Sequence, residues 1–299
     1  MKLALAPIAY YWPKEAVYRF YDAMLDAPVD IIYLGETVCA KRHELRYDDW
    51  LEIANRLRDA GKEVVLSTQV LLESDTHLNT MRKIAQNGVF PVEANDMGAV
   101  RLLFGGSPFV AGIHLNIYNP PALKLMSEMG AKRWVMPLEM NKADLAGMLM
   151  SKPEAMEVEV FGYGRMPLAF SARCFTARHY NLPKDDCRFH CLSHPGGLLL
   201  KTREKQDFLV LNGIQTQSDR VYCLVQELPA LEEMGVDIVR ISPQWENTPD
   251  IIRIYAEVLS GNLSLTVAEA ALEKVMPADP CNGYWHGKPG MHYIREDIL

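Results

Sequence analysis

The stretch LALAPIAYYWPK, residues 3–14, begins as a short apolar run and continues into a turn that holds no glycine. An open, doubly wound sheet that binds nucleotides carries a glycine-rich turn directly after its first strand. The turn here instead contains two tyrosines, a tryptophan and two prolines. We therefore expect this stretch to begin a closed parallel barrel rather than an open sheet.

The rest of the chain alternates apolar, β-branched runs with segments of helical period. Eight runs predict strands, at residues 3–6, 30–34, 63–67, 89–92, 109–115, 133–136, 157–161 and 237–241. Segments of helical period lie between most of them, at residues 13–25, 47–60, 76–87, 121–129, 142–150, 224–234 and 249–259. This order predicts an α/β fold, a TIM-barrel-like (β/α)8 single domain that covers residues 1–299.

The segment between the seventh and eighth predicted strands, about residues 162–223, is far longer than an ordinary βα loop of about 2–6 residues. We interpret it as a structured insertion at the carboxyl end of the barrel, where barrel enzymes carry their chemistry. The tail, about residues 277–299, is rich in glycine and aromatic residues. We interpret this tail as an ordered terminal strap.

Composition limits the classes of function. A hydrophobic content of 49% and a charged content of 23% are ordinary for a globular protein. The net charge of −7 argues against a general polyanion-binding surface, so nucleic acid is not an expected partner, although a local basic groove is not excluded. No apolar run reaches the roughly 18 residues of a membrane span, and Pro7 interrupts the short apolar stretch at the N-terminus. We expect a cytoplasmic protein without a transmembrane segment.

Three of the six cysteines lie close together in SARCFTARHYNLPKDDCRFHC, residues 171–191, and Cys39 follows the second predicted strand. Both segments belong to the carboxyl end of the predicted barrel. In a reducing compartment, clustered cysteines more often bind metal or do redox chemistry than form disulfides. Only Cys187 and Cys191 have the spacing of a zinc knuckle, whereas a [4Fe–4S] cluster needs four thiolates from any loops that converge. Spacing favours an iron–sulfur site and leaves a zinc site open.

The remaining cysteines, Cys223 and Cys281, lie among apolar residues or in the tail. We interpret both as small buried hydrophobic residues. Four arginines are candidates for offsetting the negative charge of the thiolates: Arg165, Arg173, Arg178 and Arg188.

Polar residues that directly follow predicted strands are further candidates, because the carboxyl ends of barrel strands meet at one face. The candidates for catalysis are His114, Asn116, Glu139 and Arg165. His114 and Asn116 are predicted to alternate on one strand, which would place both side chains towards the barrel interior or its mouth. Asn95 and Asn141 stand directly before helical stretches and are predicted to cap them.

The segment EVEVFGYGRMPLAFSARC, residues 157–174, resembles the signature of the collagenase-like peptidase family U32. VDIIYLG, VEANDMGAVRLL and HLNIYNPPALKLMSEMGAKRWVMPLEM resemble further segments of the family in the same order, so the resemblance covers most of the chain. The general signature has a cysteine at the position of Pro167 and a glycine at the position of Ala172. This departure would cost the family's usual cluster one ligand, which Cys39 would replace.

Cys39, the run Cys174-x12-Cys187-x3-Cys191 and the ending NGYWHGKPGM are similar to one subfamily, whose members act in oxygen-independent ubiquinone biosynthesis. The resemblance implies a [4Fe–4S] cluster, a metal site held by Cys39, Cys174, Cys187 and Cys191. It also implies anaerobic hydroxylation of the quinone-precursor ring in a heterodimer with a UbiU-like sister protein. A lipid-carrier protein of the same pathway is implied as a further partner, and prephenate is the oxygen donor suggested for the family.

Two alternatives remain open within the same resemblance. One is an RNA-base hydroxylase, and the other is a non-catalytic, cluster-bearing partner subunit. Proteolysis is not expected, because the chain contains neither HExxH nor GxSxG and no evident serine nucleophile with a His/Asp pair.

Overall fold

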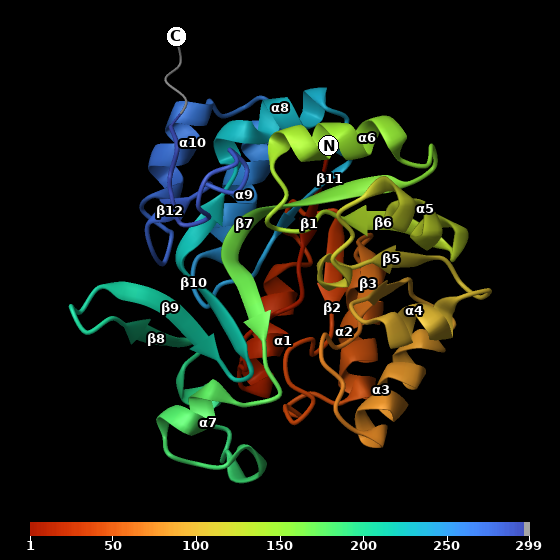
Figure 1. Ribbon diagram of the computed structural model, residues 1–299, viewed down its shortest axis with the longest axis vertical. Helices are drawn as coiled ribbons and strands as arrows, with labels where there is room; N and C mark the ends of the chain where they lie inside the picture. The colour runs from red at the N-terminus through yellow and green to blue at the C-terminus, as the bar shows by residue number, and fades with distance from the viewer. Residues whose placement is uncertain (296–299) are drawn as a thin grey trace.

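Eight parallel strands close into a barrel in the computed structural model, which describes residues 1–295 (Figure 1). Each barrel strand pairs with the next one along the chain, and β11 pairs with both β1 and β7, which closes the ring. The TIM-barrel-like (β/α)8 prediction is therefore confirmed. The barrel strands are β1 (Lys2–Leu5), β2 (Ile31–Leu34), β3 (Glu63–Ser67), β4 (Val92–Ala94), β5 (Phe109–Ala111), β6 (Ala131–Val135), β7 (Glu157–Phe170) and β11 (Ile238–Ile241).

Helices cover the outside of the barrel and follow its strands along the chain (Figure 1). The strand β2 reads IIYL and is buried at every residue, as expected where helices cover one face and the barrel interior the other. The helices are α1 (Lys14–Ala23), α2 (Tyr47–Asp59), α3 (Asp75–Ala85), α4 (Met97–Leu103), α5 (Pro120–Glu128), α6 (Lys142–Ser151), α8 (Leu228–Glu233), α9 (Thr248–Leu259) and α10 (Leu265–Leu272).

The glycine-free turn after β1 contributes buried aromatic rings rather than a nucleotide-binding loop. Tyr10, Tyr11 and Trp12 are all nearly inaccessible to solvent. The Trp12 ring contacts Trp245 and Phe20 edge-on, and its Nε1 donates to the backbone oxygen of Pro195 at 2.8 Å. The turn therefore ties the start of the barrel to the insertion that follows β7.

Two predicted strands had the wrong bounds. The predicted strand at 89–92 begins only at Val92, because Oδ1 of Asn87 accepts from the backbone nitrogens of Val89 and Phe90 and holds them in a turn. The predicted strand at 109–115 ends at Ala111. Residues Ile113–Leu115 form a 3₁₀ turn that ends with Asn116 in the left-handed region, at φ 55°. The expectation that His114 and Asn116 alternate on one strand was wrong.

One of the two predicted helix caps is correct. Asn141 Oδ1 accepts from the backbone nitrogen of Asp144 at 2.9 Å and caps α6. The prediction for Asn95 was wrong, since Asp96 is the residue that caps α4. Asn95 is instead buried, and its Nδ2 donates to the backbone oxygen of Thr68 at 3.0 Å. The predicted helix at 224–234 is a 3₁₀ turn followed by α8, which begins at Leu228 with a proline in its first turn.

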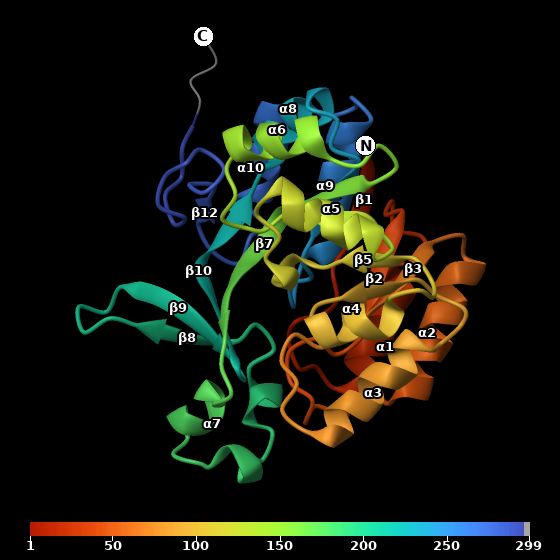
Figure 2. The same ribbon diagram turned by 45° about the vertical axis from the view of Figure 1, so that its right-hand side comes forward.

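The insertion begins inside a strand. β7 runs beyond the barrel and pairs with β10 (Gln215–Cys223) in an antiparallel ladder. β10 also pairs with β9 (Asp207–Asn212), and β9 pairs with β8 (Leu198–Lys201). Residues 171–214, which include the short helix α7 (Phe175–His179) and the β8–β9 hairpin, are called the arm. The arm projects from the end of the barrel at which the β7 arrow points (Figure 1 and Figure 2).

The described part of the predicted strap packs against the barrel. Within it, β12 (Pro280–Cys281) pairs with β10, and Trp285 is fully buried. The Trp285 Nε1 donates to Glu227 Oε2 at 2.8 Å. Residues 296–299 of the strap lie outside the described residues. Within residues 1–295, no helix has both the length and the apolar character that crossing a membrane requires.

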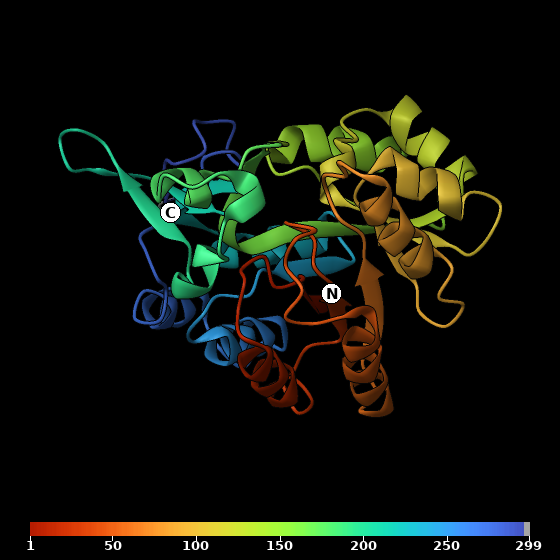
Figure 3. The ribbon, with the colours of Figure 1, turned by 90° about the horizontal axis from the view of Figure 1, so that it is seen from below.

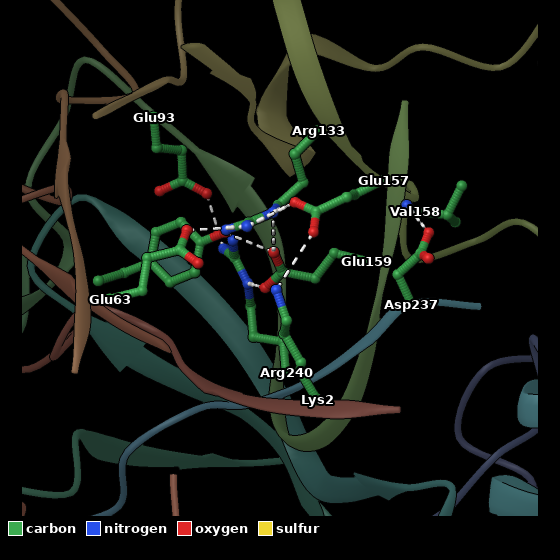
Figure 4. A network of polar contacts seen from close by, with 10 residues as sticks. Lys2, Glu63, Glu93, Arg133, Glu157, Val158, Glu159, Asp237 and Arg240 are labelled. Carbon is green, nitrogen blue, oxygen red and sulfur yellow. Dashed lines mark hydrogen bonds and ion pairs between the residues drawn. The ribbon is translucent and has the colours of Figure 1, made fainter. Parts of the chain in front are cut away.

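The barrel interior contains a network of buried charged side chains (Figure 4). Arg240 of β11 contacts Glu93 of β4 through Nη1 at 2.7 Å and Glu159 of β7 through Nε at 2.5 Å. All three residues are buried, with at most 4% of their surface exposed. The Tyr33 hydroxyl donates to Glu159 Oε2 at 2.5 Å, and the Arg240 guanidinium lies over the Tyr33 ring.

The network continues to the opposite end of the barrel through Arg133. Its Nη1 donates to the Tyr33 hydroxyl at 3.1 Å, and its Nη2 lies 2.6 Å from Glu157 and 2.8 Å from Glu63. The network thus joins β2, β3, β4, β6, β7 and β11 across the interior.

We expect the substitution Arg240→Met to lower the free energy of unfolding by about 3–5 kcal/mol, because it removes the cation that pairs with both Glu93 and Glu159 in the barrel interior. Urea denaturation at pH 7 measures this change. Arg253→Met is the matched control, since Arg253 forms an exposed pair with Asp250. The control should change the free energy of unfolding by less than about 0.5 kcal/mol. Equal effects of the two substitutions would contradict the structural role of the network.

The same variant has a defined pH dependence. Burial raises the pKa of Glu93, but Arg240 and hydrogen bonds from Ser67 and Asn95 outweigh burial and hold the pKa below its ordinary value. The resulting stability is present above the ordinary glutamate pKa and is lost as the pH falls below it. Without Arg240, burial instead favours the protonated carboxyl. The difference in unfolding free energy between parent and Arg240→Met should therefore shrink as the pH falls from the raised pKa of Glu93 in the variant, above about 4.3, to its lowered pKa in the parent.

Candidate functional site

Four free cysteines occur in the loop after β2 and in the arm. Cys39 follows β2, and Cys174 caps α7, with its Sγ accepting from the backbone nitrogen of Ala177 at 3.4 Å. Cys187 directly follows the first 3₁₀ turn after α7, Lys184–Asp186, and Cys191 lies in the second, His190–Ser193. All four are partly buried, whereas the remaining two cysteines are buried, as predicted.

The four thiols share one electrostatic environment. Burial raises the pKa of Cys191 to about 11, Arg42 lowers it, and the nearby Cys39 and Cys174 raise it. Burial also raises the pKa of Cys39, which Arg42 lowers and Cys174 raises. The pKa of Lys41 is raised mainly by its hydrogen bond to Asp185. The nearby thiols of Cys187 and Cys39 also raise it, by smaller amounts. Cys39, Cys174 and Cys191 therefore lie near one another at the carboxyl end of the barrel, and Lys41 lies near both Cys39 and Cys187.

Arg42 is the buried cation beside these thiols, with 5% of its surface exposed. Its Nη1 donates to the backbone oxygen of Ala9 at 2.8 Å, and its Nη2 donates to Asn212 Oδ1 at 2.6 Å. It also lies 3.6 Å from Glu36, whose Oε1 accepts from the backbone nitrogen of Cys39 at 3.0 Å. These contacts fix the guanidinium and the Cys39 loop relative to each other.

The sequence analysis missed Arg42 and assigned the positive charge to other arginines. Arg173, Arg178 and Arg188 are exposed, and Arg165 lies in the mouth of the barrel, where it donates to the backbone oxygens of Ser218 and Asp219. The sequence feature that could have identified Arg42 is the run VCAKRHEL, in which two basic residues closely follow Cys39.

Ion pairs and hydrogen bonds fasten the arm to the barrel beside the thiols. Lys41 Nζ lies 2.6 Å from Asp185 Oδ1 and donates to the backbone oxygen of Lys184 at 3.2 Å. The Phe189 ring packs edge-on against His43 and also contacts Tyr11. The arm is thus held against the loop that carries Cys39, and Figure 3 shows this end of the molecule from below.

The histidines near the cysteines gather around one tyrosine of the arm. The Tyr180 ring stacks on His190 with centroids 4.1 Å apart, and its hydroxyl lies 2.6 Å from His194 Nε2. His179 contacts the same ring edge-on. These contacts build a small aromatic cluster inside the arm.

The donor set fits an iron–sulfur cluster in its chemistry. Within residues 1–295, no group of three or more His, Cys, Asp or Glu side chains is arranged to hold a single metal ion. A [4Fe–4S] cluster needs a different arrangement of ligands. Each thiolate binds a separate iron, so the four thiolates surround the whole cluster rather than a single ion. The four predicted cysteines are free, partly buried thiols of the kind that such a cluster binds, and Arg42 lies near two of them, Cys39 and Cys191.

A small hollow with a cavity volume of about 60 Å³ lies next to this region in the mouth of the barrel. Two of the predicted catalytic candidates, His114 and Arg165, line it together with Glu93 and Arg240 of the buried network. Thr37, two residues before Cys39, also lines it. Three buried polar atoms have no hydrogen-bond partner within residues 1–295 and belong to lining residues: Asn95 Oδ1, Gln217 Oε1 and Arg240 Nη2.

His114 is a neutral imidazole at pH 7. Burial lowers its pKa to about 4, with Glu93 acting in the opposite direction and Arg240 in the same direction as burial. Its ring contacts Phe170 edge-on at 4.9 Å between centroids. It can therefore offer one nitrogen as a hydrogen-bond donor and the other as an acceptor to a bound molecule.

The other two catalytic candidates lie in an adjoining hollow, which His114 and Phe170 also line. Asn116 and Glu139 are both exposed there. The Tyr118 hydroxyl donates to Glu139 Oε2 at 2.6 Å. The structure thus brings all four predicted catalytic candidates to the carboxyl end of the barrel, with His114 shared between the two hollows.

Comparison with known proteins adds a family relationship. The profile of peptidase family U32 matches residues 17–295 of the chain. tRNA hydroxylation protein P of Escherichia coli (strain K12) is 20% identical to this chain over 161 residues. That alignment covers 51% of this chain and 35% of the relative, so the matched part is about a third of that protein.

Similar folds occur among solved structures. The U32 peptidase Mk0906 has a TM-score of 0.46 and 13% identity, with 82% of this chain and 93% of that chain covered. Sialic acid aldolase from Aliivibrio salmonicida has a TM-score of 0.47 and 11% identity, with 91% and 77% covered.

We expect His114→Gln to flatten the dependence of stability on pH between about pH 6.5 and 4. In the parent, the unfolded chain binds a proton in this window that the folded His114 does not, so stability falls as the pH is lowered. The slope of unfolding free energy against pH should differ by at most about 1.4 kcal/mol per pH unit between the two proteins. Urea denaturation at several pH values measures these slopes. If the unfolding free energies of the parent and His114→Gln change with pH in parallel, His114 is not held neutral.

Proposed function

This chain belongs to peptidase family U32, and from that premise we propose that it is a hydroxylase-type member that holds a [4Fe–4S] cluster and acts in oxygen-independent ubiquinone biosynthesis. The observation that supports the proposal is that Cys39 lies near Cys174 and Cys191 of the arm, with Arg42 beside Cys39 and Cys191. The U32 relationship and the likeness to a tRNA hydroxylation protein favour hydroxylation over proteolysis.

In this proposal Cys39, Cys174, Cys187 and Cys191 are the ligands of the cluster. When bound, the cluster supplies one-electron transfer at a potential that depends on nearby charge and hydrogen bonds. Arg42 offsets thiolate charge from a fixed, buried position. The backbone nitrogen of Ala177 donates to Cys174 and orients it.

The hollow in the barrel mouth is the proposed place for a polar reactant. Neutral His114 and the unpartnered atoms of Asn95, Gln217 and Arg240 offer it hydrogen bonds. Thr37, which precedes Cys39 by two residues in the chain, is one of the residues that line the hollow. Prephenate as the oxygen donor rests on the family resemblance rather than on the shape of this hollow.

The proposed partners follow from the same resemblance. The chain would be the UbiV-type subunit of a heterodimer with a UbiU-like sister protein. A lipid-carrier protein would present the quinone precursor, since the apolar tail of that substrate is insoluble. If the sister chain carries the reactive centre, this chain is a non-catalytic, cluster-bearing subunit.

An RNA-base hydroxylase is the second candidate. The similarity to tRNA hydroxylation protein P favours it. The net charge of −7 disfavours it, because RNA binding relies on basic patches and aromatic platforms.

We expect the protein purified without oxygen to contain about four iron and four sulfide per chain. Cys174→Ala should lose most of this iron and the brown absorbance, because it removes one of four ligands. Cys223→Ala is the control, since Cys223 is buried and its Sγ contacts the Tyr255 hydroxyl. Iron, sulfide and zinc analysis of the three proteins measures the effect. An iron-free, zinc-loaded parent would refute the cluster, and equal iron loss in both variants would refute the choice of ligands.

A host strain that lacks this protein should fail to make ubiquinone when grown without oxygen, and its RNA should keep normal base hydroxylation. Quinone extraction and mass spectrometry of digested RNA measure both products from the same culture. Complementation with Cys174→Ala should not restore ubiquinone, whereas Cys223→Ala should restore it. Loss of an RNA modification with normal ubiquinone would instead support the second candidate.

A further inference from the structure

A second cleft lies on the flank of the barrel between α2 and α3, two helices that lie side by side in Figure 1 and Figure 2. Its cavity volume is about 430 Å³. Its lining comes from the carboxyl ends of β2 and β3, the loop at residues 40–46 and both helices. It shares none of these residues with the hollow in the barrel mouth. The molecule therefore offers two separate places for bound molecules near the thiols.

The walls of this α2–α3 cleft are mainly apolar. They are formed by Leu34, Ala40, Leu45, Trp50, Leu66 and Ile84. The Trp50 ring is held in place by an edge-on contact with Tyr21 of α1. Exposed polar side chains such as Arg46 and Thr80 stand at the rim. An apolar interior with a polar rim accommodates the hydrocarbon part of a ligand.

The inner part of the cleft contains a buried acceptor. Gln69, which follows β3, has 7% of its surface exposed. Within residues 1–295, no group donates a hydrogen bond to its Oε1. A buried acceptor without a partner costs about 1–3 kcal/mol, and a ligand hydroxyl would remove that cost. The cleft thus combines apolar walls with one position that requires a donor.

The cleft also reaches the thiols. Ala40, which lines it, is the residue directly after Cys39. Arg42 lines it as well and lies beside Cys191, whose pKa it lowers. A ligand head near Gln69 and Arg42 would lie next to the cysteine cluster, while an apolar chain extends between the helices.

We propose that the α2–α3 cleft binds a phenol that carries an apolar chain. The phenol hydroxyl donates to Gln69 Oε1, and the chain lies along Trp50 and Ile84. The proposal rests on the proposed function, in which a chain-bearing phenol is the class of ring that is hydroxylated. It assigns the aromatic substrate to the flank and leaves the barrel mouth to the polar reactant.

Calorimetric titration of the full chain, purified without oxygen, tests this with two probes, 4-hexylphenol and hexylbenzene. Gln69→Met keeps the length of the side chain but removes the acceptor. It should weaken binding of 4-hexylphenol roughly 3–10-fold and leave hexylbenzene unchanged. Ile84→Trp fills the cleft and should weaken both probes more than 10-fold. Val267→Trp, on the exposed side of α10, is the matched control and should change neither affinity.

Unchanged binding in Ile84→Trp, or an equal loss in Val267→Trp, would place the probes elsewhere and overturn the proposal. An equal loss of both probes in Gln69→Met would refute the hydrogen bond. Iron content and the midpoint of unfolding of each variant are measured in parallel, so that misfolding is recognised. An iron-free parent that still binds 4-hexylphenol at this cleft would contradict the proposed function alone. An iron-loaded parent that binds neither probe would contradict the cleft alone.

Discussion

The contact of Arg240 with Glu93 and Glu159 is the constraint on which the barrel interior depends. Charges at this depth are tolerated only when they are paired and hydrogen-bonded, and each member of this group has a partner on another strand. The group fixes β4, β7 and β11 relative to one another at the point where β11 closes the ring. The same Glu93 and Arg240 line the hollow at the mouth, so one set of side chains both closes the barrel and shapes a binding surface.

The thiol site depends on this closure in turn. β7 leaves the barrel beside β11 and continues into the arm, so its direction sets where Cys174, Cys187 and Cys191 lie. Cys39 comes from the other side of the ring, after β2, and Arg42 joins the two sides through Ala9 and Asn212. The proposed ligand set therefore exists only in the folded chain. This arrangement also separates an apolar cleft on the flank from a polar hollow at the mouth, with the thiols near both.

Local signals in the sequence predicted some parts of the site and missed others. The cysteine spacing and the strand order placed four thiols at one end of the barrel, because parallel strands all end there. The arginines that the sequence suggested beside the thiols lie close to the cysteines along the chain, and some of them, such as Arg178, are exposed. Arg42 is buried through contacts to residues 33 and 170 positions away, which no local pattern contains. The strand containing His114 was extended too far, because its apolar pattern continues through a turn.

The sequence by itself determined the barrel. The periodicity of eight short apolar runs and the glycine-free turn after the first of them follow from local rules of burial and backbone conformation. The cysteine pattern also indicated which residues to suspect. Only the tertiary structure decided which charges face each other inside the barrel, that Asn95 is buried while Asp96 caps α4, and that Gln69 lies unpartnered in an apolar cleft. Burial and pairing depend on side chains brought together from distant segments, and a linear pattern does not specify those distances.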